Sequence, residues 1–258
     1  MLDFTTIKNH YPPKLQLFPK WMLREYLQYL ILKTIFSHPL SQKLCFIWGT
    51  ALRIGYQSSR FSEDLDFDNW WLSEKEFEII TQEIEKMLVL EGYEVEIKHI
   101  YKWAFHCMIK IPKILFENNL ADMETEKLTI KIDTTPQGIR YTSEQKILNK
   151  FWILSSYTLA PTDILLSMKF CAFFSRIKGR DLFDIIYLLS LWTQPNWDFL
   201  QQVLWISNGN HLKEEIKNKL SELNLPQLQK DVAPFLFDSK NQSVTLFPQI
   251  IAQTNFQN

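Results

Sequence analysis

The chain has 258 residues, of which 46% are hydrophobic and 14% aromatic, so it can bury a large core and hold one or two domains. Its net charge of −1 argues against a general nucleic-acid-binding protein, and its three cysteines lie inside apolar runs, which argues against a disulfide framework. No signal peptide is evident, and the apolar run at residues 27–36 is too short to span a bilayer. We therefore expect a cytoplasmic protein without a membrane partner.

The N-terminal part is predicted to contain a proline-rich arm, a helix and a short buried strand. Residues 1–19 hold three prolines and form the arm, and residues 20–37 carry a helical apolar stripe that ends before Pro39. The apolar run at residues 44–48 predicts a strand, and Gly49-Thr50 then predicts a tight turn into a helix. Such a turn presents backbone N–H groups and a helix N-terminus, which suit a phosphate.

Apolar and acidic residues alternate from Asp64 to Asp68, which predicts a strand with one buried face. Leu65 and Phe67 are expected in the core. The three aspartates, Asp64, Asp66 and Asp68, are expected to face solvent or a cleft. Carboxylates two residues apart stand about 6.6 Å apart along a strand, and they repel each other unless a cation lies between them. Mg²⁺ is the cation that best suits such oxygen ligands. The alternative is a solvated strand edge that carries acids.

Later elements are predicted from capping and periodicity. Ser73 and Glu76 form a capping box that opens a helix, and strands are expected at residues 93–100, 103–111 and 127–133 with a polar loop at 112–126. Asp133 ends the last strand on its polar face, where an ordinary turn-initiating residue is one interpretation. From Thr142 onward the pattern indicates helices, including 161–176 and 180–191.

Charged residues on these two helices need partners. Lys169 lies in the middle of an apolar stripe, where it either pairs with an acid or extends its ammonium to the surface. Asp181 and Asp184 lie three residues apart on one face of the following helix.

Two blocks of residues together resemble the AbiEii/AbiGii family of bacterial nucleotidyltransferase toxins, within the polymerase-β-like superfamily. The first block runs from Gly49-Thr50-Ala51-Leu52 to Arg60-Phe61-Ser62-Glu63-Asp64-Leu65-Asp66, and the second comprises Lys169 and Arg180-Asp181 with Asp184. The family usually carries Gly-Gly-Thr, Arg-x-Ser-x-Asp-Leu-Asp, and a later Lys with Arg-Asp-x-x-Asp. Trp48 replaces the first glycine here, and its large side chain would narrow the approach of a triphosphate.

The resemblance implies an α+β fold, with a nucleotidyltransferase-type mixed β-sheet flanked by helices and followed by a C-terminal helical bundle. Residues 1–37 would form the N-terminal arm and helix, 38–140 the nucleotidyltransferase core, and 141–258 the C-terminal helical domain.

The resemblance also implies roles for individual residues. Asp64, Asp66 and Asp133 would hold Mg²⁺, with Mn²⁺ as an alternative, and Lys169 and Asp184 would complete the catalytic set. The expected nucleotide-binding residues are Gly49, Thr50, Arg60, Ser62, Lys169, Arg180 and Asp181. For Arg60 and Arg180, pairing with Asp181 and Asp184 is the alternative to contacting phosphate.

The function implied is that of a toxin of a toxin–antitoxin or abortive-infection system, which transfers a nucleotidyl group from an NTP to a hydroxyl acceptor such as the 3′ end of tRNA. A cognate antitoxin is the further partner implied. Two alternatives stay open at the level of sequence: a phosphotransferase that uses the same site, and a non-catalytic nucleotide- or partner-binding homologue.

Overall fold

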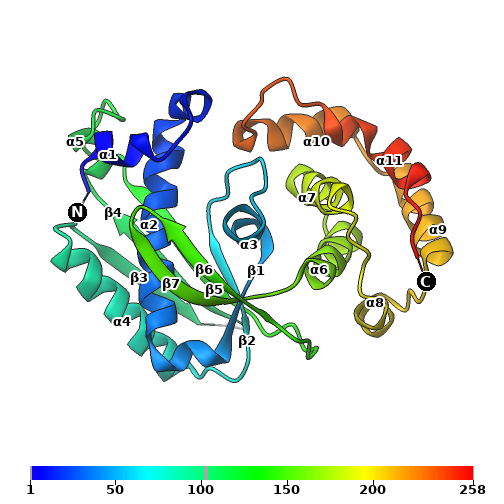
Figure 1. The fold of residues 1–258 in the computed structure, drawn as a ribbon, viewed down its shortest axis with the longest axis horizontal. Helices are drawn as coiled ribbons and strands as arrows, with labels where there is room; N and C mark the ends of the chain where they lie inside the picture. Colours follow the sequence, from blue (N-terminus) through cyan, green and yellow to red (C-terminus); the bar gives the residue numbers. More distant parts are fainter. Residues whose placement is uncertain (1, 102–103, 258) are drawn as a thin grey trace. The chain divides into compact units, whose positions relative to one another are not determined.

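The computed structural model describes residues 2–101 and 104–257, which form two compact units (Figure 1). The sheet unit comprises Met1–Gly55, Ser62–Gly138 and Ser143–Leu159, and the helical unit comprises Tyr56–Phe61, Ile139–Thr142 and Ala160–Asn258. The α+β fold class predicted from the sequence is confirmed, since a mixed sheet with flanking helices is followed along the chain by a helical region. No helix in the described ranges is long and apolar enough to cross a membrane.

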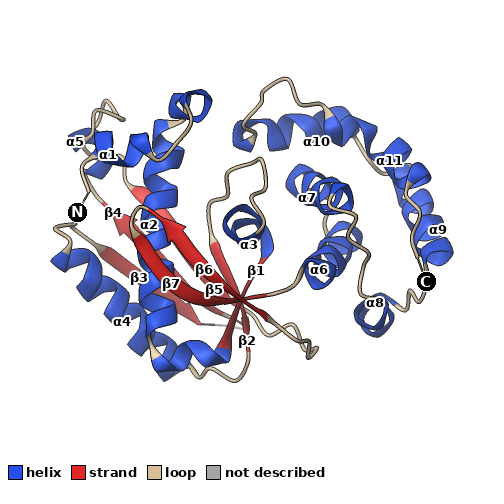
Figure 2. Cartoon of the chain, viewed as in Figure 1, coloured by secondary structure: helices blue, strands red, loops and turns tan. Residues whose placement is uncertain are grey.

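The sheet unit is built on one mixed sheet of seven strands in the order β3-β4-β5-β2-β1-β7-β6 (Figure 2). Parallel pairs join β2 to β5 and β1 to β7, and the other neighbours are antiparallel. The strands are β1 (Leu44–Ile47), β2 (Leu65–Asn69), β3 (Glu96–Tyr101), β4 (Phe105–Ile111), β5 (Leu128–Thr134), β6 (Glu144–Lys150) and β7 (Ile153–Leu159).

Alternation of apolar and polar residues determines which face of each strand is buried. Along β5, Leu128, Ile130 and Ile132 are buried, and the residues between them are partly exposed, as predicted. Leu65 and Phe67 of β2 are likewise buried. The strand expected over 103–111 is present as β4, and Trp103, where it was expected to begin, lies outside the described residues.

The sheet unit contains α1 (Phe4–Asn9), α2 (Pro19–Ser37), α3 (Trp48–Gly55), α4 (Glu74–Leu90) and α5 (Ile114–Glu117). Short 3₁₀ segments at Pro13–Leu17 and Pro39–Lys43 flank α2. The long α2 packs on β5, β6 and β7 and also contacts α4, so these two helices cover the same face of the sheet. The predicted capping box opens α4, because Ser73 and Glu76 satisfy each other's backbone N–H groups.

The expectation of helices from Thr142 onward was wrong for residues 144–159. These residues form the β6–β7 hairpin, which belongs to the sheet unit. The turn consists of Phe151 and Trp152, both left-handed at φ 57° and 58°, whereas such turns normally contain Asn, Asp or Gly. Phe151 adopts this conformation while buried, with its ring against those of Tyr11, Tyr26 and Tyr29. Tertiary packing therefore determines a turn that the local sequence does not signal.

The helical unit contains α6 (Thr162–Ser175), α7 (Gly179–Ser190), α8 (Trp197–Leu204), α9 (Gly209–Leu220), α10 (Leu225–Val232) and α11 (Phe247–Gln253) (Figure 1). Short 3₁₀ segments lie at Ala233–Phe235 and Ser243–Leu246. α6 packs against α7 and α8, and α7 also packs against α10. α7 and α10 approach closely at Gly179, where an added Cβ would lie 1.9 Å from the carbonyl oxygen of Leu228.

Candidate functional site

Two of the predicted acids, far apart in the sequence, are neighbours in the sheet. Asp66 of β2 and Asp133 of β5 are register partners in a parallel pair, so their side chains leave the same face of the sheet. Asp64 lies just before β2 and two residues from Asp66, and all three side chains are partly exposed. The structure thus brings together the three carboxylates that were predicted to hold a metal.

Asp68 does not belong to this group, contrary to the expectation that it would share the exposed face. It is 1% exposed, and its carboxylate accepts hydrogen bonds from Trp70 Nε1 at 3.0 Å and from the backbone N–H of Gln137 at 2.9 Å. The buried carboxylate of Asp68 therefore stabilises the loop that follows β5, and we do not assign it a ligand-binding role.

Asp133 has basic neighbours on both sides. His106 of β4 is its register partner, and His106 Nδ1 is hydrogen bonded to one carboxylate oxygen of Asp133. The ammonium of Lys131, two residues earlier on β5, forms an ion pair with the other oxygen. Both oxygens of Asp133 are therefore engaged by side chains from the sheet itself.

The electrostatics of the acids suit a divalent cation. Burial raises the pKa of Asp64, and the charges of Glu63 and Asp133 raise it further, against smaller opposing effects of Lys131 and Arg24. Within residues 2–101 and 104–257, no three His, Cys, Asp or Glu side chains converge as a ready metal cage. The donors present are carboxylate oxygens, the ligand type that Mg²⁺ and Mn²⁺ prefer.

Buried polar side chains position the backbone of the acidic segment. Gln28 of α2 donates from Nε2 to the carbonyl oxygens of Ser62 and Glu63, at 3.0 and 2.9 Å. Thr50 is fully buried, and its hydroxyl donates to the carbonyl oxygen of Asp64. Thr50 therefore positions the backbone at Asp64, a role additional to the phosphate contact predicted from the sequence. The signal for Gln28 in the sequence is its place inside an apolar helical stripe.

Glu25 forms a buried charge cluster that orients α3, the helix containing Gly49 and Thr50. Its carboxylate is bound by Arg53 of α3 at 2.7 Å, Lys150 of β6 at 2.6 Å and the Tyr11 hydroxyl at 3.0 Å. Burial alone would raise the pKa of Glu25, but the two cations outweigh it and hold that pKa below its ordinary value. The sequence analysis did not identify this cluster, because its members are distant along the chain.

Trp48, which stands where the family carries glycine, has φ 65°. This left-handed conformation is open to glycine at little cost and is unfavourable for a bulky residue. The conformation explains the glycine of the family pattern and shows that this chain keeps the turn geometry with a large side chain in place.

The helical unit contains the second group of predicted residues in a buried charge network. Lys169 of α6 pairs with Asp181 at 3.0 Å and with Asp184 at 2.7 Å, both on α7. Arg60 binds both carboxylate oxygens of Asp184, at 2.7 and 2.6 Å. Burial would raise the pKa of Asp184, but Arg60 and Lys169 outweigh it and lower that pKa. Lys169 is only 3% exposed, so its ammonium is paired inside the unit rather than extended to the surface.

Of the two predicted arginines, Arg60 takes the alternative that pairs it with an α7 aspartate. The guanidinium carbon of Arg180 lies 4.4 Å from the ring centre of Phe235, in the geometry of a cation–π contact.

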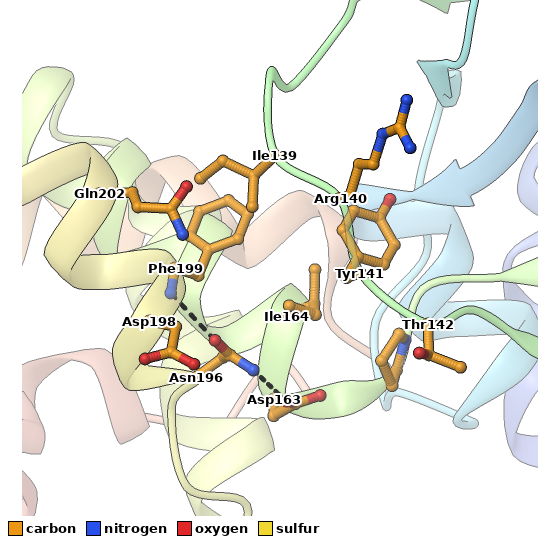
Figure 3. Close-up of a pocket in the computed structure, with 11 residues that line it drawn as sticks. Ile139, Arg140, Tyr141, Thr142, Asp163, Ile164, Asn196, Asp198, Phe199 and Gln202 are labelled. Atoms are coloured by element: carbon orange, nitrogen blue, oxygen red, sulfur yellow. Dashed lines mark hydrogen bonds between the residues drawn. The ribbon is translucent and has the colours of Figure 1, made fainter.

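A pocket of about 450 Å³ lies within the helical unit (Figure 3). Asn196, at the start of α8, bridges its two sides by donating to Asp163 at 3.0 Å and accepting from the backbone N–H of Phe199 at 2.9 Å. None of the predicted site residues is among those that line it: Ile139, Arg140, Tyr141, Thr142, Pro161, Asp163, Ile164, Asn196, Asp198, Phe199 and Gln202.

Comparison with known proteins gives a family and a fold. The family model described as nucleotidyl transferase AbiEii toxin, type IV toxin–antitoxin system, matches residues 30–249. No curated protein matches the chain significantly.

Solved structures share the architecture at low sequence identity. JHP933 from Helicobacter pylori is 20% identical, with a TM-score of 0.57 and 90% of each chain covered. MenT4, a nucleotidyltransferase toxin from Mycobacterium tuberculosis H37Rv, is 12% identical, with a TM-score of 0.57. The match covers 99% of this chain and 91% of the MenT4 chain. At these identities the structural likeness establishes the fold.

Proposed function

The chain belongs to the AbiEii nucleotidyltransferase toxin family, and from that premise we propose that it transfers a nucleotidyl group from an NTP to a hydroxyl of an RNA acceptor, such as the 3′ end of tRNA. The proposal includes a divalent cation, Mg²⁺ or Mn²⁺, held by Asp64, Asp66 and Asp133, and a cognate antitoxin as partner in the cytoplasm.

One observation carries the proposal: Asp66 and Asp133 are adjacent across the β2–β5 pair, with Asp64 next to them. Carboxylates that leave the same face of neighbouring strands can share a divalent cation, which the proposed transfer would use. Burial, and then the charges of Glu63 and Asp133, raise the pKa of Asp64, so its ionised form lacks a compensating charge of sufficient strength. A dication bound there would stabilise the oxygen that attacks and the oxygen that leaves.

The residues of the chain would divide the remaining work. Asp133, which is hydrogen bonded to His106, would accept the proton of the attacking hydroxyl. The Gly49 turn and Ser62 would contact the triphosphate. Asp181 and Asp184 would hold the Lys169 ammonium, as they do in the helical unit. Thr50 and Gln28 would keep the acidic segment in register with β5.

A transfer assay tests the proposal directly. Purified protein is incubated with Mg²⁺, total tRNA and each NTP labelled at the α-phosphate, and labelled RNA is resolved by gel electrophoresis. We expect at least one NTP to label RNA. The rate of labelling should fall by about 10²–10⁴-fold in Asp66→Asn and in Asp133→Asn. Asp122→Asn removes an exposed aspartate of the same unit and should leave labelling unchanged. Absence of transfer with every NTP would refute the proposal.

The alternatives have their own signatures in the same assay. A phosphotransferase would label the acceptor from γ-labelled rather than α-labelled NTP. A non-catalytic binding protein is favoured by Trp48, whose side chain occupies a position that the family leaves to glycine. If Trp48→Gly left both NTP affinity and transfer unchanged, the binding-protein candidate would lose this support.

A further inference from the structure

Lys131 is a cation placed within the acidic group of the sheet unit. It lies on the same face of β5 as Asp133, because the two residues are two positions apart in a strand. Its ammonium pairs with Asp133, and its side chain is 36% exposed. Lys131 also acts on Asp64, since its charge opposes the rise in the pKa of that carboxyl.

The other lysine at this strand has a different setting. Lys127, just before β5, is 37% exposed, and its ammonium lies 2.5 Å from Glu96 of β3, outside the acidic group. The two lysines thus match in residue type, exposure and ion pairing, but only Lys131 pairs with a carboxylate predicted to bind metal.

We propose that Lys131 is a resident cation of the acidic site, which competes with a divalent cation for Asp133 and thereby sets the metal affinity. The inference deepens the proposed function and depends on it for the identity of the metal site. Asp133 offers two oxygens, and the one paired with Lys131 is open to a dication only when the ammonium leaves. The apparent metal affinity is then the intrinsic affinity multiplied by the fraction of molecules in which Lys131 has released Asp133.

The size of the effect follows from the exposure of the pair. Partly exposed ion pairs favour their closed form by about two- to fivefold. Removing the ammonium should therefore tighten metal binding by about three- to sixfold. None of the variants changes His106, which contacts the other oxygen of Asp133, so the comparison isolates the ammonium of Lys131.

The test measures Mn²⁺ binding to the full chain by the electron paramagnetic resonance signal of free Mn²⁺, without nucleotide or RNA. Lys131→Met should bind Mn²⁺ about three- to sixfold more tightly than wild type. Lys131→Arg keeps a cation that can pair with Asp133 and should stay near wild type. Lys127→Met removes the same charge just before the same strand and should also stay near wild type. Thermal melts confirm that each variant is folded.

The outcomes separate this inference from the proposed function. Unchanged or weaker Mn²⁺ binding in Lys131→Met would overturn the inference, as would equal tightening in Lys127→Met, which would indicate a general charge effect. Absence of Mn²⁺ binding in both wild type and Lys131→Met would overturn it as well. If Mn²⁺ binding tightened as expected while the transfer assay gave no product, the inference would stand and the proposed activity would fall.

Discussion

Replacing Arg60 with Met should reveal how strongly the buried charge network stabilises the protein. The Arg60 side chain is 2% exposed and that of Asp184 is fully buried, and they share two hydrogen bonds of 2.7 and 2.6 Å. Methionine fills much of the arginine volume but leaves Asp184 with Lys169 as its remaining charge partner. Removing one partner from a buried ion pair typically costs about 3–5 kcal/mol.

The expected loss is large enough to measure by thermal unfolding. For a chain of this size, about 3–5 kcal/mol corresponds to a decrease in Tm of roughly 6–20 °C. Lys20→Met is the matched control, because Lys20 pairs with Glu126 at 2.6 Å but both side chains are largely exposed, at 50% and 41%. That change should cost less than about 1 kcal/mol.

The pH dependence gives an independent check on the cause. Because the folded-state pKa of Asp184 is lowered, the ion-pair stabilisation is present above the unfolded pKa of about 4 and is lost as the pH falls through the folded value. The difference in Tm between wild type and Arg60→Met should therefore be full at pH 7 and shrink in strong acid. A loss of less than about 1 kcal/mol at pH 7, or one that does not change with acid, would refute the argument.

Three further variants test other parts of the structure by thermal melts. Glu25→Gln should cost about 3 kcal/mol, because it leaves two mostly buried basic side chains, those of Arg53 and Lys150, without their carboxylate; a change below about 1 kcal/mol would contradict this. Gly179→Ala should cost about 1–3 kcal/mol, because the new Cβ meets the Leu228 carbonyl at 1.9 Å; an unchanged Tm would mean that α10 can shift. Trp48→Gly should be more stable than Trp48→Ala by about 1–2 kcal/mol, because only glycine relieves the left-handed backbone; equal stability would rule out that strain.

The sequence was informative where local pattern and burial agree. The period of two in β2 and β5 follows from one buried face, and it correctly placed Asp66 and Asp133 on polar faces. The resemblance added the expectation that Asp133 joins the acid pair, and the register places Asp133 opposite Asp66. The capping box of Ser73 likewise fixed the start of α4, because both partners lie within one turn.

The sequence was uninformative where partners are distant along the chain. The His106–Asp133 contact depends on the register between β4 and β5, which no local pattern specifies. The hairpin at Phe151 and Trp152 was missed because rings from the N-terminal region, rather than turn-forming residues, stabilise its left-handed backbone. Asp68 matched the acidic alternation and was expected on the exposed face. Only the structure shows that its carboxylate is buried and accepts hydrogen bonds from Trp70 and Gln137.

The two groups of acids differ in a way that separates binding from structural roles. Asp184 is buried and its pKa is lowered by its cation partners, so its charge is already balanced, and a positioning role towards Lys169 suits it. Asp64 is partly exposed and its pKa is raised by burial and then by neighbouring acids, so its ionised form is disfavoured in the folded chain. Asp64→Asn should therefore raise stability in metal-free buffer at pH 7, by about 0.5–2 kcal/mol, as removal of a strained functional charge often does.

The sign of this effect follows from linkage. A raised folded-state pKa means that stability decreases as the pH rises from the unfolded value of about 4 through the folded value, and asparagine mimics the protonated form. Asp184→Asn should change stability in the opposite direction, since it removes the charge that Arg60 and Lys169 require. Urea unfolding in EDTA measures the free energy of unfolding of both variants and of the wild type. With Mg²⁺ in place of EDTA, the wild type should become more stable than Asp64→Asn, because the ion binds and stabilises only the wild type. If both substitutions destabilised the protein equally without metal, the acids near β2 would be structural, and the case for a cation site there would fail.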